Sequence, residues 1–311
     1  MNEYVYYLAP LVGFIANVAG GFWGLGGGWF IVPSLLVFGV PDVVAVGASL
    51  LQMVFSTMPT VGRQFKSIGW KRGGWGISLA LPLCLMSFLG GFFGCPLGEF
   101  VEYLSNHSRK PHQVIYFLLL AFIFYKTLCS RDKAHDDNAV AELKPWKPGI
   151  IGFIIGAVSA MLGIGGGAIT RPAMKGLLGV PENITGKISR LAVSVTAVSG
   201  SISYLSGMKG FHAGDPGRDS LVIGLLLAVG GFAGFALGAW IHGKVLAAGQ
   251  GAKAGRSFAW MVLPVMVALG FKIFNLPLWG CGAIFFAGIF LMFYLLRMYD
   301  HARSINKKDL L

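Results

Sequence analysis

Two long apolar regions of the chain are interrupted by clusters of glycine, and this pattern limits what the chain can fold into. The regions cover about residues 8–39 and 149–180, and the clusters are Gly24-Leu-Gly-Gly-Gly28 and Gly163-Ile-Gly-Gly-Gly167. Each region is too long for one straight helix across a hydrocarbon core of about 30 Å. Consecutive glycines also destabilise a helix. We therefore expect each region to form two half-helices joined by a glycine turn, whose backbone must be satisfied by protein or by a water-filled cavity.

The remaining apolar segments predict a protein that crosses a membrane several times. The chain is 55% hydrophobic and only 12% charged, about half the charge of a soluble domain. Its net charge of +12 does not indicate nucleic-acid binding, because Lys and Arg lie in short clusters between apolar segments. The bilayer is therefore an expected partner and nucleic acid is not. Segments long enough for one spanning helix each lie at 43–62, 74–96, 113–129, 186–206, 221–241, 257–275 and 278–297.

The chain contains an internal repeat. The first glycine cluster is followed by Gly39-Val-Pro41 and the second by Gly179-Val-Pro181, 140 residues later. Glycines spaced by four recur in the same register, as Gly90, Gly94 and Gly98 and then Gly230, Gly234 and Gly238. A register held over this length indicates a duplication. The four-residue spacing predicts that these glycines lie where two helices pack closely.

The repeat and the spans together predict an all-α polytopic membrane protein. Each copy would form a glycine-broken helical hairpin followed by three transmembrane helices, with one extra C-terminal transmembrane helix. The expected divisions are a first membrane repeat at 1–130, a cytoplasmic linker at 131–148, a second membrane repeat at 149–276, and the extra helix with a cytoplasmic tail at 277–311. Three spans between the hairpins would invert the second copy relative to the first.

The positions of the basic residues predict the orientation in the membrane. If the copies are inverted, most of the 25 Lys and Arg residues fall on one side of the bilayer. The positive-inside rule assigns that side to the cytoplasm. We therefore expect the N-terminus outside and the C-terminus in the cytoplasm.

The two glycine turns are the predicted substrate site. The second half-helix of each hairpin begins at its turn, so its free N–H groups and positive dipole end can bind an anion. Opposed discontinuous helices in inverted repeats are common in secondary transporters. The competing interpretation is close helix packing alone. The predicted binding residues of the turns are Gly24, Gly26, Gly27, Gly28, Gly163, Gly165, Gly166 and Gly167.

Polar residues of the helix after each hairpin complete the predicted site. Ser49 and Ser189 are related by the repeat, and Gln52 follows Ser49 by three residues. We expect these three to orient the ligand; the alternative is that they bond only to their own helices. Arg190, whose repeat counterpart is Leu50, is expected to offset the charge of the anion. Its alternative role is to extend toward the lipid headgroups.

The residue types missing from the spans argue against other chemistry. The carboxylates fall in loops, at loop edges or in the tails, so no proton relay is expected within the membrane. The six His residues lie at or beyond helix ends, and the four Cys residues form no CxxC motif. We predict no catalytic residue, no metal site and no cofactor, and hence no enzyme. The alternatives left open are a passive anion channel and a membrane redox protein that uses its cysteines.

The repeated motif G-[LI]-G-G-G-x4-P followed by G-V-P, in a duplicated chain of this size, resembles the sulfite exporter TauE/SafE family of bacterial membrane proteins. The resemblance extends from about Leu11 to Met298. It implies a secondary transporter of small sulfur-containing or organic anions, such as sulfite or sulfonates, in the bacterial cytoplasmic (inner) membrane. We expect an exporter that works by alternating access, with the anion bound near the midplane at the opposed half-helix N-termini. The sequence leaves open which anion is carried and the oligomeric state, a homodimer included.

Overall fold

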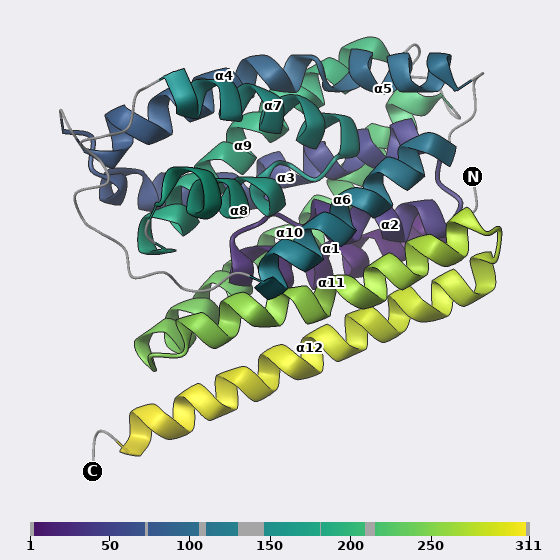
Figure 1. Ribbon diagram of the computed structural model, residues 1–311. Helices are drawn as coiled ribbons and strands as arrows, with labels where there is room; N and C mark the ends of the chain where they lie inside the picture. The colour runs from purple at the N-terminus through teal and green to yellow at the C-terminus, as the bar shows by residue number, and fades with distance from the viewer. Residues whose placement is uncertain are drawn as a thin grey trace.

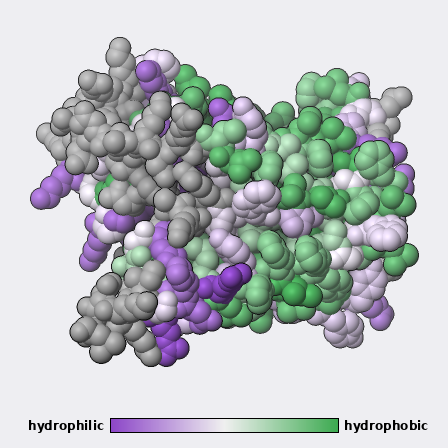
Figure 2. Space-filling view, turned by 60° about the horizontal axis from the view of Figure 1, so that its bottom comes forward, coloured by the Kyte–Doolittle hydropathy of each residue, from purple (hydrophilic) through white to green (hydrophobic). Residues whose placement is uncertain are grey.

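The computed structural model is helical throughout the part of the chain that it describes, which confirms the predicted fold class. Within that part, six helices are long and apolar enough to cross a membrane, or seven if one bent pair counts as a span. Figure 2 shows hydrophobic residues over most of one face, with hydrophilic residues toward its left end. The described residues are 3–71, 74–105, 110–129, 146–180, 182–208 and 215–308.

The elements of the first copy follow the predicted order. They are α1 (Tyr4–Trp23), α2 (Gly28–Val37), α3 (Asp42–Gln64), the 3-10 helix η1 (Phe65–Ile68), the π-helix η2 (Gly76–Ala80), α4 (Leu81–Phe92), α5 (Gly94–Leu104) and α6 (Lys110–Cys129).

The second copy repeats this order, and one further helix follows it. The elements are α7 (Trp146–Leu162), α8 (Gly167–Leu178), α9 (Glu182–Gly207), α10 (Pro216–Ala247), α11 (Gly251–Ile273) and α12 (Pro277–Lys308). Most of the predicted linker, 131–148, lies outside the described residues, and its last three residues belong to α7. The helix α12 lies along one edge of the bundle, beside α11 (Figure 1).

Each glycine-broken region forms two helices joined by its glycine turn, as predicted. The two helices are unequal, because α2 and α8 have 10 and 12 residues whereas α7 has 17. The helix α1 has 20 residues, which corresponds to about 30 Å. It begins at Tyr4 because the aromatic residues ahead of the predicted start also pack. Tyr4 donates a hydrogen bond to the carbonyl of Phe38, and Tyr6 donates one to Asp219 of α10.

The predicted span 74–96 is not one straight helix. It begins as the π-helix η2, continues as α4, and bends by 46° before α5. Pro96 explains the bend, because a proline inside a helix lacks an N–H donor and its ring clashes with the carbonyl four residues earlier. The apolar run therefore extends to Leu104, farther than predicted.

The two copies pack on each other in a reciprocal pattern. The helix α1 lies along α10 of the second copy, and its repeat counterpart α7 lies along α4 of the first (Figure 1). The equivalent helices α3 and α9 pack together between them. The start of α1 and the end of α12 lie at opposite ends of the bundle (Figure 1). Termini on opposite sides of a membrane require such an arrangement.

The four-spaced glycines lie in these interfaces, as predicted. A Cβ atom added at Gly230, Gly234 or Gly238 of α10 would collide with a backbone carbonyl of α1. Gly90 of α4 meets the carbonyl of Phe153 in α7 in the same way, and Gly94, the first residue of α5, meets the Cβ and backbone of Ala160. Gly98 is the exception, because it lies beyond the bend and its nearest neighbour is the hydroxyl of Tyr204.

A single methyl group added to the α1–α10 interface tests this packing. Gly234→Ala should lower the thermal stability of the purified protein, because overpacking a close interface costs about 1–3 kcal/mol. The matched control is Gly243→Ala on the same helix, where an added Cβ meets no atom within 4 Å. That control should melt at or above the wild-type temperature, because alanine favours a helix. Equal melting temperatures for the two variants would contradict the assignment.

Candidate functional site

The two glycine turns touch each other at the centre of the molecule. Gly28 of the first turn packs against the carbonyl of Gly163 in the second, and Gly167 packs against Leu25 of the first. Gly28 also lies against Ile164, the repeat counterpart of Leu25, so the two glycines make equivalent contacts. A Cβ atom at Gly28 or Gly167 would collide with the opposite backbone. The structure therefore brings both predicted turns together, and close contact between them requires glycine.

The backbone conformation of the turns gives a second reason for glycine. Residues with a side chain rarely adopt positive φ angles. The positive φ angles are 67° at Gly24, 76° at Gly26, 69° at Gly163, 73° at Gly165 and 89° at Gly166. A packing motif inside a continuous helix does not need this conformation, whereas a turn that ends one helix and starts the next does.

The short helices begin at these turns without a capping side chain. The residues Gly27 and Gly166, which precede α2 and α8, make no side-chain cap. Their carbonyls accept the first bonds of the helices, from Phe30 and from Ile169. The N–H groups before those donors, including those of Gly28 and Gly167, have no acceptor within their own helix. Each helix therefore directs free N–H groups and the positive end of its dipole at the centre.

The two repeat-related serines form hydrogen bonds to carbonyl groups of the turns, and each binds to the turn of the other copy. Ser49 of α3 donates to the carbonyl of Gly163 at 2.8 Å. Ser189 of α9 donates to the carbonyl of Gly24 at 3.3 Å and lies 3.4 Å from that of Gly167. A serine has one hydroxyl proton to donate. These serines therefore use that proton on the turns and keep only lone pairs for a ligand.

Two apolar side chains cover the turns on the side of α3 and α9. Met53 and Val193 are related by the repeat, and both are fully buried. Each lies against both Gly26 and Gly165, so the pair fills the space in front of the turns. In this structure the centre is closed.

Arg190 of α9 places a guanidinium group against the first turn. Only 6% of its surface is exposed. A Cβ atom at Gly24 would lie 3.0 Å from Nε of Arg190 and 3.3 Å from its Nη2. The Nη1 atom donates to Oε1 of Gln64 at 3.0 Å, whereas Nε has no hydrogen-bond partner. Among the described residues, no carboxylate forms an ion pair with Arg190.

The second turn has no corresponding cation. Leu50 occupies the position equivalent to Arg190, and Gly163 is lined by Val32 and Val46. The backbone of the site is therefore nearly symmetric, whereas its charge is concentrated at the first turn.

The side chain of Gln52 bonds to its own helix, which is the alternative interpretation for this residue. Its side chain is fully buried, donates to Ser56 at 2.7 Å and packs against Gly231 of α10. Asn17 of α1 lies beside it and contacts Gly27 of the first turn. Sequence reasoning missed Asn17, although a lone amide in the middle of an apolar helix was the available signal.

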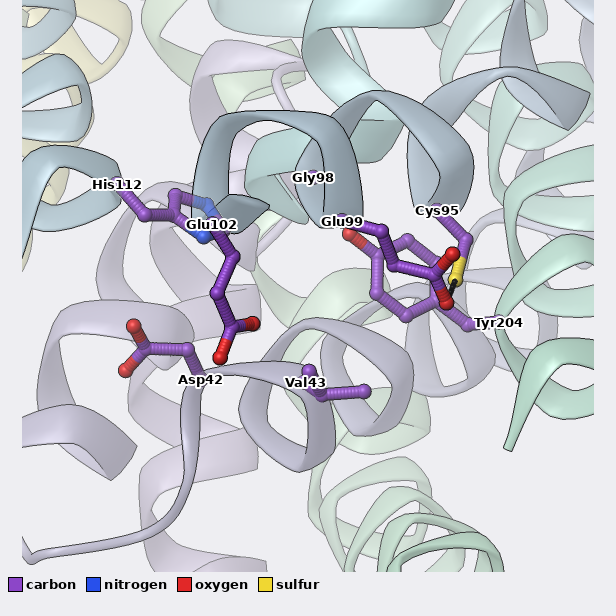
Figure 3. A pocket seen from close by; sticks show the side chains of 8 residues that line it. All are labelled: Asp42, Val43, Cys95, Gly98, Glu99, Glu102, His112 and Tyr204. Atoms are coloured by element: carbon purple, nitrogen blue, oxygen red, sulfur yellow. Dashed lines mark hydrogen bonds between the residues drawn. The ribbon is translucent and has the colours of Figure 1, made fainter. Parts of the chain in front are cut away.

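A separate cavity is lined by acidic residues (Figure 3). Carboxylates are expected in loops, at loop edges or in the tails, and Asp42 lies at such an edge, where it begins α3 with 6% of its surface exposed. Glu99 and Glu102 depart from this expectation, because they lie in the helix α5. In Figure 3 the side chains of Asp42, Glu102 and His112 lie on one side of the cavity, and Glu99 meets Cys95 on the other. Glu99 and Glu102 line the same cavity as Asp42 because the chain continues after the bend as α5.

This cavity is remote from Arg190 along α9, although it is closer to the second turn, because Asp42 is four residues before Val46, which lines Gly163. Tyr204 lines it, 14 residues after Arg190 on the same helix, which corresponds to roughly 21 Å. None of the predicted site residues lines it. The acidic cavity and Arg190 therefore occupy different levels of the bundle.

Comparison with known proteins assigns the chain to a family. It is 29% identical over 230 residues to a "Probable membrane transporter protein" of Methanocaldococcus jannaschii, a match that covers 71% of this chain and 80% of the relative. A relative in Bacillus subtilis with the same description is 27% identical over 266 residues, which cover 77% of this chain and 89% of that protein. No solved structure matches this one.

The match to the family itself covers most of the membrane part. The sequence model described as "Sulfite exporter TauE/SafE" matches residues 9–273, which include both glycine turns. A plant relative, "Sulfite exporter TauE/SafE family protein 1" of Arabidopsis thaliana, is 32% identical over 84 residues, 27% of this chain and 18% of that protein. The chain is thus a multi-pass membrane transporter and belongs to the sulfite exporter TauE/SafE family.

Proposed function

We propose that this transporter carries small sulfur-containing or organic anions, such as sulfite or sulfonates, out of the cytoplasm of a bacterium. The observation that carries the proposal is the guanidinium of Arg190, which is buried beside Gly24 without a carboxylate partner among the described residues. An isolated buried charge costs several kcal/mol. A bound anion offsets that cost, and the free N–H groups at the start of α2 add to the attraction.

The arrangement of the two copies supports alternating access. We infer that the copies are inverted, because the helices pair reciprocally and the basic residues then gather on one side. On this proposal the N-terminus is outside, Arg190 lies toward the cytoplasm and the acidic cavity lies toward the exterior. An anion would then be attracted at the cytoplasmic end and repelled from the outer end, which favours export.

Two other functions make different demands on the protein. A passive channel needs a continuous path, whereas Met53 and Val193 close the centre. A redox protein needs reactive cysteines, and the described Cys84, Cys95, Cys129 and Cys281 are free thiols on four different helices. The anion transporter uses the turns and Arg190, so it accounts for more of the structure than either alternative.

Removing the charge of Arg190 tests the proposal. In proteoliposomes, Arg190→Ala should raise the half-saturating anion concentration by roughly 30-fold or more, because losing one partner of a buried charge pair costs about 2–5 kcal/mol. Flux is measured for sulfite, thiosulfate, isethionate and acetate. Arg297→Ala, which removes an exposed charge of α12, is the control and should behave as wild type. The proposal is wrong if Arg190→Ala transports any of these anions with the same half-saturating concentration and maximal rate as the wild type.

Opening the centre should convert transport into leak. Met53→Ala removes the side chain that lies against both Gly26 and Gly165, so a passive and non-saturating flux of the same anion is expected. The matched control is Met58→Ala, because Met58 is exposed on the same helix. If Met53→Ala keeps saturable flux with no leak, Met53 does not close the path.

Membrane voltage should drive the flux, and a pH gradient should not. The acidic cavity is roughly 21 Å along α9 from Arg190, so an anion bound at Arg190 has no carboxylate of that cavity beside it. One negative charge that leaves the cell gains about 2.3 kcal/mol per 100 mV. Isethionate is the test anion, because its charge is constant near neutral pH. Outward flux that follows the pH gradient and ignores an imposed potassium diffusion potential would contradict this mechanism.

A further inference from the structure

The end of α3 is joined to α9 at two points. Arg190 donates to the side chain of Gln64, the last residue of α3, and Lys187 donates from Nζ to the carbonyl of Ser67 at 3.2 Å. The two donors are three residues apart on α9, and the two acceptors are three residues apart on α3 and η1. Residues three apart on a helix lie on one face. Gln64 is therefore held in a fixed place relative to Arg190.

The hydrogen bond from Arg190 to Gln64 determines which edge of the guanidinium remains for a ligand. Gln64 accepts the hydrogen bond of Nη1, whereas Nε and Nη2 are the guanidinium nitrogens nearest to Gly24. Nε, which has no partner among the described residues, belongs to the edge that lies against the turn. Two parallel N–H groups of arginine match two oxygens of one oxyanion. The available edge therefore suits a sulfite, sulfonate or carboxylate group better than a halide.

The amide of Gln64 holds this geometry without neutralising the charge. An amide oxygen accepts a hydrogen bond and carries no formal charge. A carboxylate in the same place would form an ion pair with Arg190 and compete with an incoming anion. The choice of Gln over Glu at the end of α3 therefore preserves the positive charge at the first turn.

We propose that Gln64 is a positioning residue for substrate binding, which orients Arg190 toward the first glycine turn and leaves its charge for an oxyanion. This inference rests on the proposed function, since it assigns Arg190 to the anion. It adds a residue outside the predicted site, and it names the oxyanion group as the part of the substrate that is recognised.

The test compares Gln64→Glu with Gln64→Ala in the full-length protein. Counterflow of thiosulfate, isethionate and acetate in proteoliposomes gives the half-saturating concentration and the maximal rate, with chloride as competitor. Melting temperature in anion-poor buffer is the second readout. Gln250→Glu is the matched control, because it makes the same change just before α11, where a carboxylate suits a helix N-terminus.

The two variants should change these readouts in different ways. Gln64→Glu should raise the half-saturating concentration about tenfold with the maximal rate largely kept, and it should raise the melting temperature, because the buried charge gains a partner. Gln64→Ala keeps the charge and loses the acceptor. It should raise the half-saturating concentration about threefold, lower the melting temperature and make chloride a better competitor. General damage would lower stability and affinity together in both variants.

Each failure has a separate meaning. If the flux kinetics of Gln64→Glu equal those of the wild type, the proposed role of Gln64 is wrong. It is also wrong if Gln64→Glu does not melt at a higher temperature than the wild type. Absence of wild-type flux for every anion tested overturns the proposed function. In that case the melting temperatures still decide whether Gln64 holds an uncompensated charge.

Discussion

The contact between the two glycine turns is the constraint on which the rest of the structure depends. Gly28 meets the carbonyl of Gly163, and Gly167 meets Leu25, with no room for a side chain at either glycine. Non-helical backbone at this depth needs donors from the protein for its carbonyls. Ser49 and Ser189 supply them across the boundary between the copies. Because each serine must reach the opposite turn, α3 and α9 have to pack together at the centre, with α1 and α7 outside them.

The duplication gives the two turns a similar backbone, but the charged side chains beside them differ. Gly24 and Gly163 have equivalent positions and similar φ angles, but only Gly24 has a guanidinium beside it. An arginine in place of Leu50 would bury another uncompensated charge close to the first, and each such charge costs several kcal/mol. Arg171 of α8 already acts on Arg190 as a like charge, so a third arginine would add to this repulsion.

The sequence predicted the parts of this site that depend on local pattern. Glycine clusters inside apolar runs predicted the turns, and four-residue spacing predicted close helix packing at these glycines but not that α1 and α7 are the partners. The partners of Ser49 and Arg190 could not be predicted in this way, because they lie 114 and 126 residues away and depend on how α3 meets α9. The acidic cavity was missed for the same reason. It exists because Pro96 bends a span and carries Glu99 back over α3.

The two serine contacts differ in a way that bears on how the centre can move. Ser49 makes one bond of 2.8 Å, to Gly163. Ser189 lies 3.3 Å from the carbonyl of Gly24 and 3.4 Å from that of Gly167, so its single proton is shared by both turns. Alternating access requires one copy to shift against the other. On the proposed mechanism, a small shift of α9 would redirect the hydrogen bond of Ser189 from one turn to the other, so this serine stays bonded in both positions.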